Sequence, residues 1–430
     1  MKEGSGGKDY KTGGWSAHYI LIICSLLYLV NYMDRQVLSA VLEPMKIDLG
    51  LSDTQAGSLH TVFLLSMAFF SVPVAYLVDR WSRRKAVACM AILWSVFTYV
   101  TGLGRSFIGV LIPRVLVGVG ESGFSSGGTA MLSAVYPPQS RGKVMGVFNL
   151  VIPIGAALGV ILGGYFSRNY GGWRTPFYVF AVPGIVLGIL AFFMRDYKTV
   201  HHMDDRGKKL GFVSSALSLF KIPSLKWMYI GYGVRNIMTF SILVWLSAFF
   251  MRSREIAEDK AGMLAGLVMM MAIAGAILGG TLSDIWQKRN PRARMLLAMA
   301  GDGLAAAALI SALFLDMRGA GYVLAVLYGI LVMVGTPALS AVSQDVVMPS
   351  LKGTSWGMAV LCMILLGGGW APILVGAISD ALGGGAAGLK AALIMVAFSG
   401  FAAAFLFWIG SRHYPADMDR VKNAMLEAEK

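Results

Sequence analysis

The sequence predicts an all-α integral membrane protein in which twelve transmembrane helices form two six-helix pseudo-repeat bundles. Three observations support this prediction: the composition is strongly apolar, about twelve apolar segments are each long enough to span a bilayer, and two loop motifs recur half a chain apart. Of the 430 residues, 57% are hydrophobic and 14% are charged. The mean hydropathy is +0.67, far above that of an ordinary soluble domain.

The formal net charge of +14 does not indicate nucleic-acid binding. The lysines and arginines fall in short clusters between apolar runs, which is typical of the cytoplasmic loops of a membrane protein. The three cysteines lie inside apolar segments, so we expect no disulfide framework. A phosphate-binding glycine loop is lacking, so ATP is not expected as an energy source, and we expect no cofactor. The His- and Asp-containing stretch at 201–205 is interpreted as a solvated linker rather than a metal site.

A window of about 20 apolar residues locates the spans. Their approximate bounds are 17–42, 54–78, 86–104, 107–132, 143–166, 175–194, 226–250, 261–283, 294–315, 320–344, 354–379 and 388–410. The chain is thus divided into a tail (1–16), a first bundle (17–194), a connector (195–225), a second bundle (226–410) and a tail (411–430). Loops on the side of the connector carry about twice as many basic residues as the others, which places the connector and both termini in the cytoplasm.

Two loop motifs occur twice. A small residue, Leu, Asp, Trp and a basic cluster follow the second span at 75–85, and they recur after the eighth span at 280–289. A Pro-x-x-basic-Gly sequence at 138–142 recurs at 349–353, at nearly the same offset. Two unrelated loops that repeat with one spacing indicate a duplicated unit.

Twelve spans in two repeats, with acidic and basic loops after the second and eighth, resemble the major facilitator superfamily. The resemblance covers nearly the whole chain, and a glycine series at 155–164 also fits it. Ala75 and Ser82 replace the usual glycines of the loop motif. The resemblance implies that charged loop residues hold a cytoplasmic gate shut; the alternative is that they only fix topology. The residues concerned are Asp79, Arg80, Arg83, Arg84, Asp284, Lys288 and Arg289.

Ionisable residues within the spans are few, and such residues are costly in lipid and usually face the bundle interior. Asp34 and Arg35 lie in the first span, and Arg114 and Glu121 lie in the fourth. Arg114 and Glu121 are two helical turns apart and therefore share one face. Adjacent residues point about 100° apart, so Asp34 and Arg35 each need a partner elsewhere. We expect that partner to be Arg114 or Glu121.

Burial favours the neutral form of a carboxyl group, whereas a nearby arginine favours its charged form. We therefore predict that Asp34 or Glu121 takes up a proton during a transport cycle; the alternative is a static charge network that fixes helix packing. In the second half, Arg235 and Asn236 are candidate substrate contacts, because arginine suits a phosphate or carboxylate. Structural pairing of Arg235 with Asp302 is the alternative there.

Residues 31–39 (Asn-Tyr-Met-Asp-Arg-Gln-Val-Leu-Ser) and the Arg-x3-Gly-x-Gly-Glu motif of 114–121 look like those of the spinster branch, relatives of lysolipid and sphingosine-phosphate transporters. That resemblance implies proton-linked, alternating-access transport of an amphipathic lipid-like or anionic substrate, with its head group near Arg35 and Arg114. It also implies a bacterial inner membrane, and we expect a monomer. Organic-anion symporters share the Asn-Tyr-x-Asp-Arg start and remain an alternative. We expect no enzyme, although a membrane-embedded lipid enzyme is the alternative from a different class.

Overall fold

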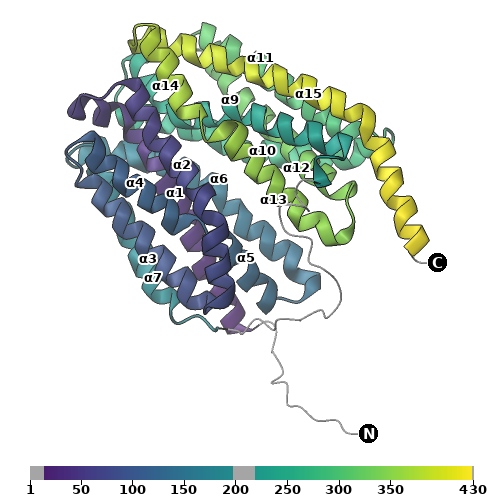
Figure 1. The fold of residues 1–430 in the computed structure, drawn as a ribbon. Coiled ribbons are helices and arrows are strands. Elements are labelled where there is room, and N and C mark those ends of the chain that lie inside the picture. Colours follow the sequence, from purple (N-terminus) through teal and green to yellow (C-terminus); the bar gives the residue numbers. More distant parts are fainter. Residues whose placement is uncertain (1–13, 197–217, 429–430) are drawn as a thin grey trace.

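The structure is a computed structural model that describes residues 14–196 and 218–428, and within these ranges the regular elements are all helices. Figure 1 shows the helices in two groups. The first group contains α1 (Trp15–Leu49), α2 (Asp53–Arg80), α3 (Arg83–Gly102), α4 (Phe107–Glu121), α5 (Phe124–Val135), α6 (Pro138–Asn169) and α7 (Thr175–Ala191). The second group contains α9 (Pro223–Arg254), α10 (Glu258–Gln287), α11 (Ala293–Phe314), α12 (Ala320–Asp345), the 3₁₀-helix η1 (Pro349–Leu351), α13 (Lys352–Met363), the π-helix η2 (Ile364–Gly368), α14 (Ala371–Ala381) and α15 (Gly385–Ala428).

The predicted fold class is confirmed, because each of the twelve predicted spans is helical. Ten described helical segments are long and apolar enough to cross a membrane, and α7 is a shorter apolar helix. Two predicted spans are interrupted. The fourth consists of α4 and α5, which are separated at Ser122 and Gly123. The eleventh consists of α13, η2 and α14.

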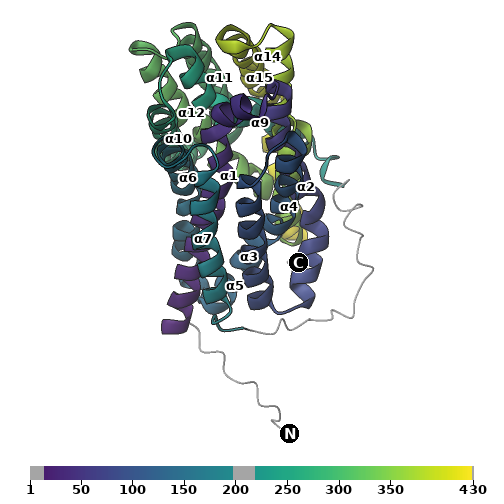
Figure 2. The ribbon, with the colours of Figure 1, turned by 90° about the vertical axis from the view of Figure 1, so that its left-hand side faces the viewer.

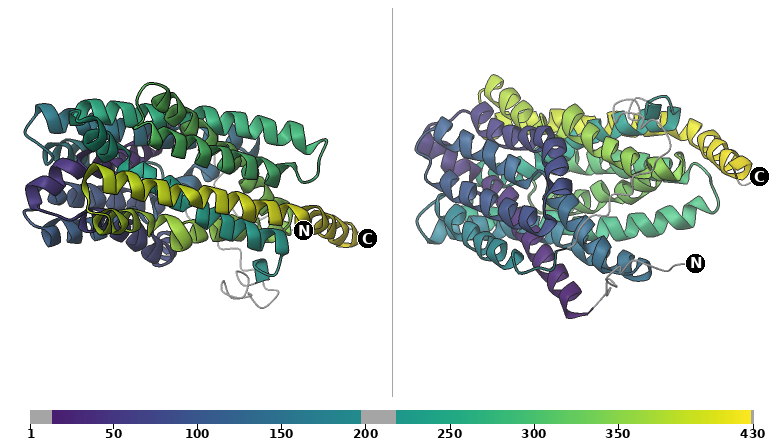
Figure 3. Two further views of the ribbon diagram at one scale, coloured as in Figure 1. Left: turned by 90° about the horizontal axis from the view of Figure 1, so that it is seen from above. Right: turned by 60° about the horizontal axis from the view of Figure 1, so that its bottom comes forward.

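Both described chain ends lie at one end of the molecule. We call the end where α1 begins and α15 ends the termini face, and the other end the opposite face (Figure 3). The turn between α1 and α2 lies at the opposite face. It begins at Gly50, whose left-handed φ of 62° lets its N–H bond to the carbonyls of Ile47 and Lys46 and so ends α1. This turn sets the position of Asp53, the first residue of α2.

The two groups are in close contact through glycines. A Cβ at Gly57 of α2 would overlap the carbonyl oxygen of Pro372, next to the start of α14, and one at Gly376 of α14 would overlap that of Asp53. On the other flank α6 packs against the start of α10, and Figure 2 shows the two helices as neighbours; a Cβ at Gly262 would lie 2.6 Å from the Val160 oxygen. Because glycine has no side chain, the helix backbones of the two groups can come into direct contact at these positions.

Charged residues reinforce this contact at the opposite face. We call Glu43, Lys46, Asp53, Arg252, Ser379 and Asp380 the opposite-face cluster. Arg252, at the end of α9, donates to both oxygens of Asp53 at 2.7 and 2.8 Å and pairs with Glu43 at 2.6 Å. Lys46 pairs with Asp53 at 2.5 Å, and Ser379 donates to the same carboxylate at 2.6 Å. The buried Asp53 carboxylate thus receives donors from both groups.

The start of α2 is capped by the other group. The Asp380 carboxylate, at the end of α14, accepts hydrogen bonds from the backbone N–H groups of Asp53 at 3.0 Å and Thr54 at 2.8 Å. These N–H groups have no partner within α2, because they belong to its first turn. Figure 1 shows the groups meeting near α2 and α14 and diverging toward the termini face. The structure is therefore closed at the opposite face.

We predict that Gly57→Val opens the opposite face. The added side chain would collide with the Pro372 backbone, which cannot move away as a flexible side chain can. Spin labels at the exposed positions Ile47 and Leu382, with the native cysteines replaced, should report a longer distance in lipid nanodiscs than in the parent protein. Gly357→Val is the matched control, because a Cβ there meets no atom within 4 Å. An unchanged distance in Gly57→Val would contradict the prediction.

Candidate functional site

The charged residues predicted in the first and fourth spans lie together inside the first helix group. Arg35 of α1 donates from Nε to the Glu121 carboxylate of α4 at 2.7 Å. The Arg35 side chain is 16% exposed and the Glu121 side chain is fully buried. Glu121 is the last residue of α4, so the interruption before α5 lies next to this ion pair. The structure therefore links α1 to α4 through a charged hydrogen bond, which is stronger than a neutral one.

Arg114 is fully buried two turns before Glu121. Among the described residues, no side chain or backbone group accepts a hydrogen bond from any of its three guanidinium nitrogens. Its guanidinium instead lies over the Phe63 ring of α2, 4.8 Å from the ring centroid. Arg35 approaches the same ring at 5.8 Å and the Tyr32 ring at 4.6 Å. Two cations thus contact one aromatic ring, an arrangement that stabilises each guanidinium without neutralising it.

Asp34 is fully buried on the face of α1 that points toward α3 and α4. Its carboxylate lies beside Trp94 and Thr98 of α3, and it interacts electrostatically with Glu121 and Arg114. Neither Trp94 nor Thr98 reaches normal hydrogen-bond geometry, so within the described structure both carboxylate oxygens lack a hydrogen bond. A buried polar group without a partner is costly, and such groups in native structures call for an explanation.

We call Asp34, Arg35, Arg114 and Glu121 the central cluster. Two carboxylates and two guanidinium groups give it a net charge of zero when all four are ionised, as burial in lipid requires. The charges are satisfied unequally. Arg35 and Glu121 bond to each other, whereas Asp34 and Arg114 interact only over a longer distance. Chemically, Arg114 can accept an anionic partner and Asp34 can accept a proton.

Gly118 and Gly120 make room for helices rather than for a ligand. From the sequence alone, the space beside Gly118 and Gly120 on α4 could hold either another helix or a ligand. In the structure, a Cβ at Gly118 would lie 2.6 Å from the Phe63 carbonyl oxygen of α2, and one at Gly120 would lie 3.0 Å from the Trp94 nitrogen of α3. These contacts hold Phe63 and Trp94 against the central cluster.

A short polar chain leads from the central cluster toward the opposite face. His60 of α2 is 4% exposed, and its Nε2 lies 3.3 Å from the Ser39 hydroxyl of α1, which donates to Gln36 at 3.2 Å. Arg114 also interacts electrostatically with the imidazole ring of His60. Sequence reasoning did not identify Phe63 or His60 as neighbours of the cluster, because a single Phe or His in an apolar span has no distinctive spacing.

In the second helix group, Arg235 of α9 is paired with Asp302 of α11. Its Nε lies 3.3 Å from the Asp302 carboxylate, and both side chains are buried. The Nη atoms donate to the Thr336 hydroxyl at 3.1 Å and to the Val332 carbonyl, both on α12. Asn236 donates to the Tyr232 carbonyl one turn earlier on α9, at 2.6 Å. Arg235 thus lies at ion-pair distance from Asp302 while α12 holds its guanidinium, and substrate contact by Arg235 and Asn236 stays a prediction.

The charged loop residues lie near the termini face. The side chains of Asp79 and Arg80, at the end of α2, are outside the described part of the structure. Residues 201–205 of the connector are outside it as well. Arg84 donates to the Met194 carbonyl at 3.3 Å, and Asp284 lies 3.6 Å from Arg294. Each of these contacts stays within one helix group. Arg83 begins α3, and Lys288 and Arg289 directly follow α10; the gate role of these residues stays a prediction.

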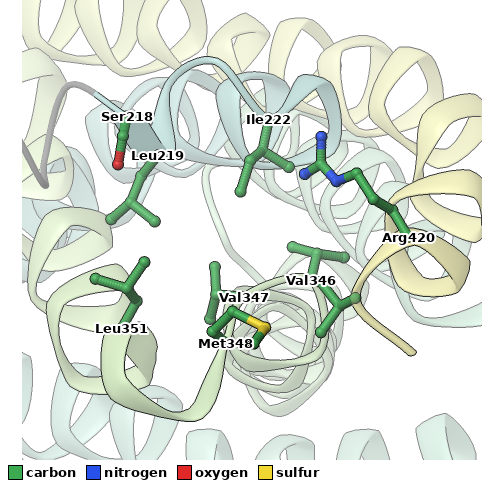
Figure 4. Close-up of a pocket in the computed structure, with 9 residues that line it drawn as sticks. Ser218, Leu219, Ile222, Val346, Val347, Met348, Leu351 and Arg420 are labelled. Carbon is green, nitrogen blue, oxygen red and sulfur yellow. The ribbon is translucent and has the colours of Figure 1, made fainter. Parts of the chain in front are cut away.

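A small cavity of about 230 Å³ lies apart from the central cluster, where α9 begins and α12 ends (Figure 4). Apolar side chains such as Leu219, Ile222 and Val346 line it, with Arg420 of α15 at its edge. None of the predicted site residues lines this cavity. The central cluster therefore remains the candidate site.

Comparison with known sequences identifies the family. The sequence model of the Major Facilitator Superfamily matches residues 24–372. The chain belongs to this superfamily of transporters. The predicted resemblance is thereby confirmed, and the twelve-helix, two-repeat architecture is that of the superfamily.

Within the superfamily the chain resembles the spinster branch. Protein spinster homolog 1 of Xenopus tropicalis is 27% identical over 92% of this chain and 82% of that protein. An MFS-type efflux pump of Mycolicibacterium smegmatis is 26% identical over 94% of both chains. A solved bacterial homologue of the human lysosomal transporter spinster, in an inward-facing and unoccupied conformation, has a TM-score of 0.82 at 23% identity and covers 96% of this chain and 99% of its own. A D-xylose-proton symporter shares the fold more distantly, with a TM-score of 0.67 at 16% identity over 91% of this chain and 97% of its own.

We predict that Glu121→Gln destabilises the protein by about 3 kcal/mol, the lower end of the range for breaking a buried ion pair, because Arg35 keeps some exposure. The substitution leaves the Arg35 charge without its partner. Thermal unfolding in detergent would measure the loss, and the double variant Arg35→Gln/Glu121→Gln should regain much of it. Asp316→Asn, which breaks an exposed pair with Lys390, should cost less than about 1 kcal/mol. Equal losses in the two single variants would argue against a buried, coupled pair.

Proposed function

We propose that this protein is a secondary active transporter that moves an amphipathic lipid-like or anionic substrate by alternating access, coupled to protons. The observation that carries the proposal is the central cluster, in which a buried guanidinium and a buried carboxylate both lack hydrogen-bond partners among the described residues. Ionisable groups at such depth in a membrane bundle commonly mark substrate and ion pathways. Membership of a transporter superfamily supports this interpretation.

The charge of the central cluster suggests how proton and substrate are linked. A proton on Asp34 or Glu121 would leave two guanidinium groups and one carboxylate, a net charge of plus one. A single anionic head group would restore neutrality, and neutrality is what a low-dielectric interior favours. Protonation of Glu121 would also release Arg35, which now donates to it at 2.7 Å. Arg35 and Arg114 could then bind the anion together.

The substrate that we favour is an amphipathic anion with a lipid tail. Both arginines rest on aromatic rings, so the head-group site is bordered by apolar surface. The resemblance to the spinster branch implies a lipid-like substrate, and the similar proteins include spinster homologues, one of them a bacterial homologue of a lysosomal transporter. An organic-anion symporter is the second candidate, because the guanidinium of Arg114, which lacks a hydrogen-bond acceptor among the described residues, would also suit the carboxylate of a small sugar acid.

The proposed orientation places both termini in the cytoplasm of a bacterial cell, with the inner membrane as the location. The termini face would then be cytoplasmic and the opposite-face cluster would lie outside, so the structure would be inward-facing. Residues 17–194 and 226–410 would be the two rocking units, joined by the 195–225 connector, and the working unit would be a monomer. Asp79, Arg80 and the other charged loop residues would close the cytoplasmic side in the outward-facing state.

The experiment that tests the proposal is transport into proteoliposomes under an imposed pH gradient, with labelled lysophosphatidylglycerol as the probe. We predict gradient-dependent movement in the parent protein. Asp34→Asn or Glu121→Gln should reduce the movement to the level of protein-free vesicles, because each removes a carboxyl group that can carry the proton. Arg114→Gln should abolish probe binding, because it removes the guanidinium that has no hydrogen-bond acceptor among the described residues.

The other outcomes identify the alternatives. Movement of gluconate but not of the lysolipid would favour an organic-anion symporter. Chemical conversion of the probe by detergent-solubilised protein would indicate a membrane enzyme instead. Full gradient-driven transport by both Asp34→Asn and Glu121→Gln would refute coupling through these carboxylates.

A further inference from the structure

The Asp302 carboxyl group is a further buried acid, which the proposed cycle does not use. It is fully buried in α11, directly between Gly301 and Gly303. Throughout the described structure, neither of its oxygens receives a hydrogen bond. Its ion-pair partner is the Nε of Arg235, and the separation of 3.3 Å is 0.6 Å longer than the 2.7 Å between Arg35 and Glu121. Asp302 is thus loosely paired in an apolar span.

Arg235 does not depend on Asp302 for its position. Two of its nitrogens donate to the Val332 carbonyl and the Thr336 hydroxyl of α12. The guanidinium carbon also lies 5.6 Å from the centroid of the Tyr232 ring. The arginine therefore keeps three interactions when the charge of Asp302 is lost. In a static structural pair, by contrast, the carboxylate would be expected to satisfy the arginine directly with good hydrogen-bond geometry.

The surroundings of Asp302 contain few other ionisable groups. The charged group that interacts with the Asp302 carboxylate is Arg235 of α9. Two titratable hydroxyl groups also interact with Asp302 electrostatically, those of Tyr232 of α9 and Tyr328 of α12. The packed face of α15 contributes the methyl group of Ala404, which faces Gly303. A carboxyl group in such surroundings can be neutralised by one proton without disturbing a network of donors.

We propose that Asp302 is a second proton-binding site, which takes up and releases a proton during the cycle while α12 keeps Arg235 in place. Among the described residues, each helix group then has a carboxyl group without hydrogen bonds between its first and third spans: Asp34 of α1 faces α3, and Asp302 of α11 faces α9. Protonation of Asp302 leaves the charge of Arg235 uncompensated. The second group becomes more positive, which favours the passage of an anion between the groups.

Infrared spectroscopy of the reconstituted protein tests the proton site without any substrate. We predict a carbonyl-stretch band of a protonated carboxylic acid that grows as the pH is lowered from alkaline to mildly acidic values. Asp302→Asn should remove this component, Asp34→Asn should leave it, and Asp316→Asn, an exposed control just after α11, should change nothing. A spectrum in which Asp302→Asn removes no band, or removes one that never varies with pH, would overturn the proposal.

The consequence for transport rests on the proposed function and is measured separately. In proteoliposomes with lysophosphatidylglycerol as the probe, Asp302→Asn should lower the number of protons moved per substrate by one, while exchange of labelled for unlabelled probe stays within about twofold of the parent rate. The double variant Arg235→Gln/Asp302→Asn, which removes both charges, guards against misfolding of the single variant and should show the same ratio.

The two hypotheses can fail independently. A parent protein that moves neither lysolipid nor gluconate with protons would refute the proposed function, yet the infrared titration would still decide whether Asp302 binds a proton. An unchanged proton-to-substrate ratio in Asp302→Asn would refute the second site while leaving proton-coupled transport intact.

Discussion

The need to balance buried charge inside a bilayer governs the arrangement of the first helix group. Burying four ionised side chains on α1 and α4 would cost too much free energy if their charges were not balanced, and the net charge of the four is zero. The Arg35–Glu121 bond fixes how α1 and α4 meet. Gly118 then lets α2 approach closely enough to place the Phe63 ring beside both guanidinium groups. The remaining charges, on Asp34 and Arg114, are therefore positioned by their neighbours and are free to bind other partners.

The same helices connect the central cluster to the closure at the opposite face. Arg35 and Glu43 are eight residues apart on α1, about 12 Å along the axis. Asp53 and Phe63 are ten residues apart on α2, about 15 Å. Opening the opposite face requires Arg252 to leave Glu43 and Asp53, and requires Asp380 to leave the start of α2. A rigid-body movement of the first helix group that breaks these contacts therefore also moves the central cluster relative to the second group.

The sequence predicted the fold and the members of the central cluster, since both leave periodic signals. Repeated loops revealed the two halves, and the seven-residue spacing of Arg114 and Glu121 revealed a shared helix face. The opposite-face cluster left no such signal. Its charges sit at helix ends, where ionisable residues are ordinary, and Asp53 and Arg252 are brought together only by the packing of the two groups. The break between α4 and α5 was likewise missed, because Ser122 and Gly123 are common inside membrane helices.

The two helix groups differ in how they hold their arginines, and this difference bears on where a substrate anion binds. In the first group the guanidinium of Arg114 has no hydrogen-bond acceptor among the described residues. In the second group that of Arg235 is occupied by the Val332 carbonyl and the Thr336 hydroxyl. An anion gains more from a guanidinium that need not first break bonds to protein, since leaving those acceptors unpaired would cost free energy. The first group is therefore better suited to binding the head group, and the second to adjusting the charge around it through Asp302.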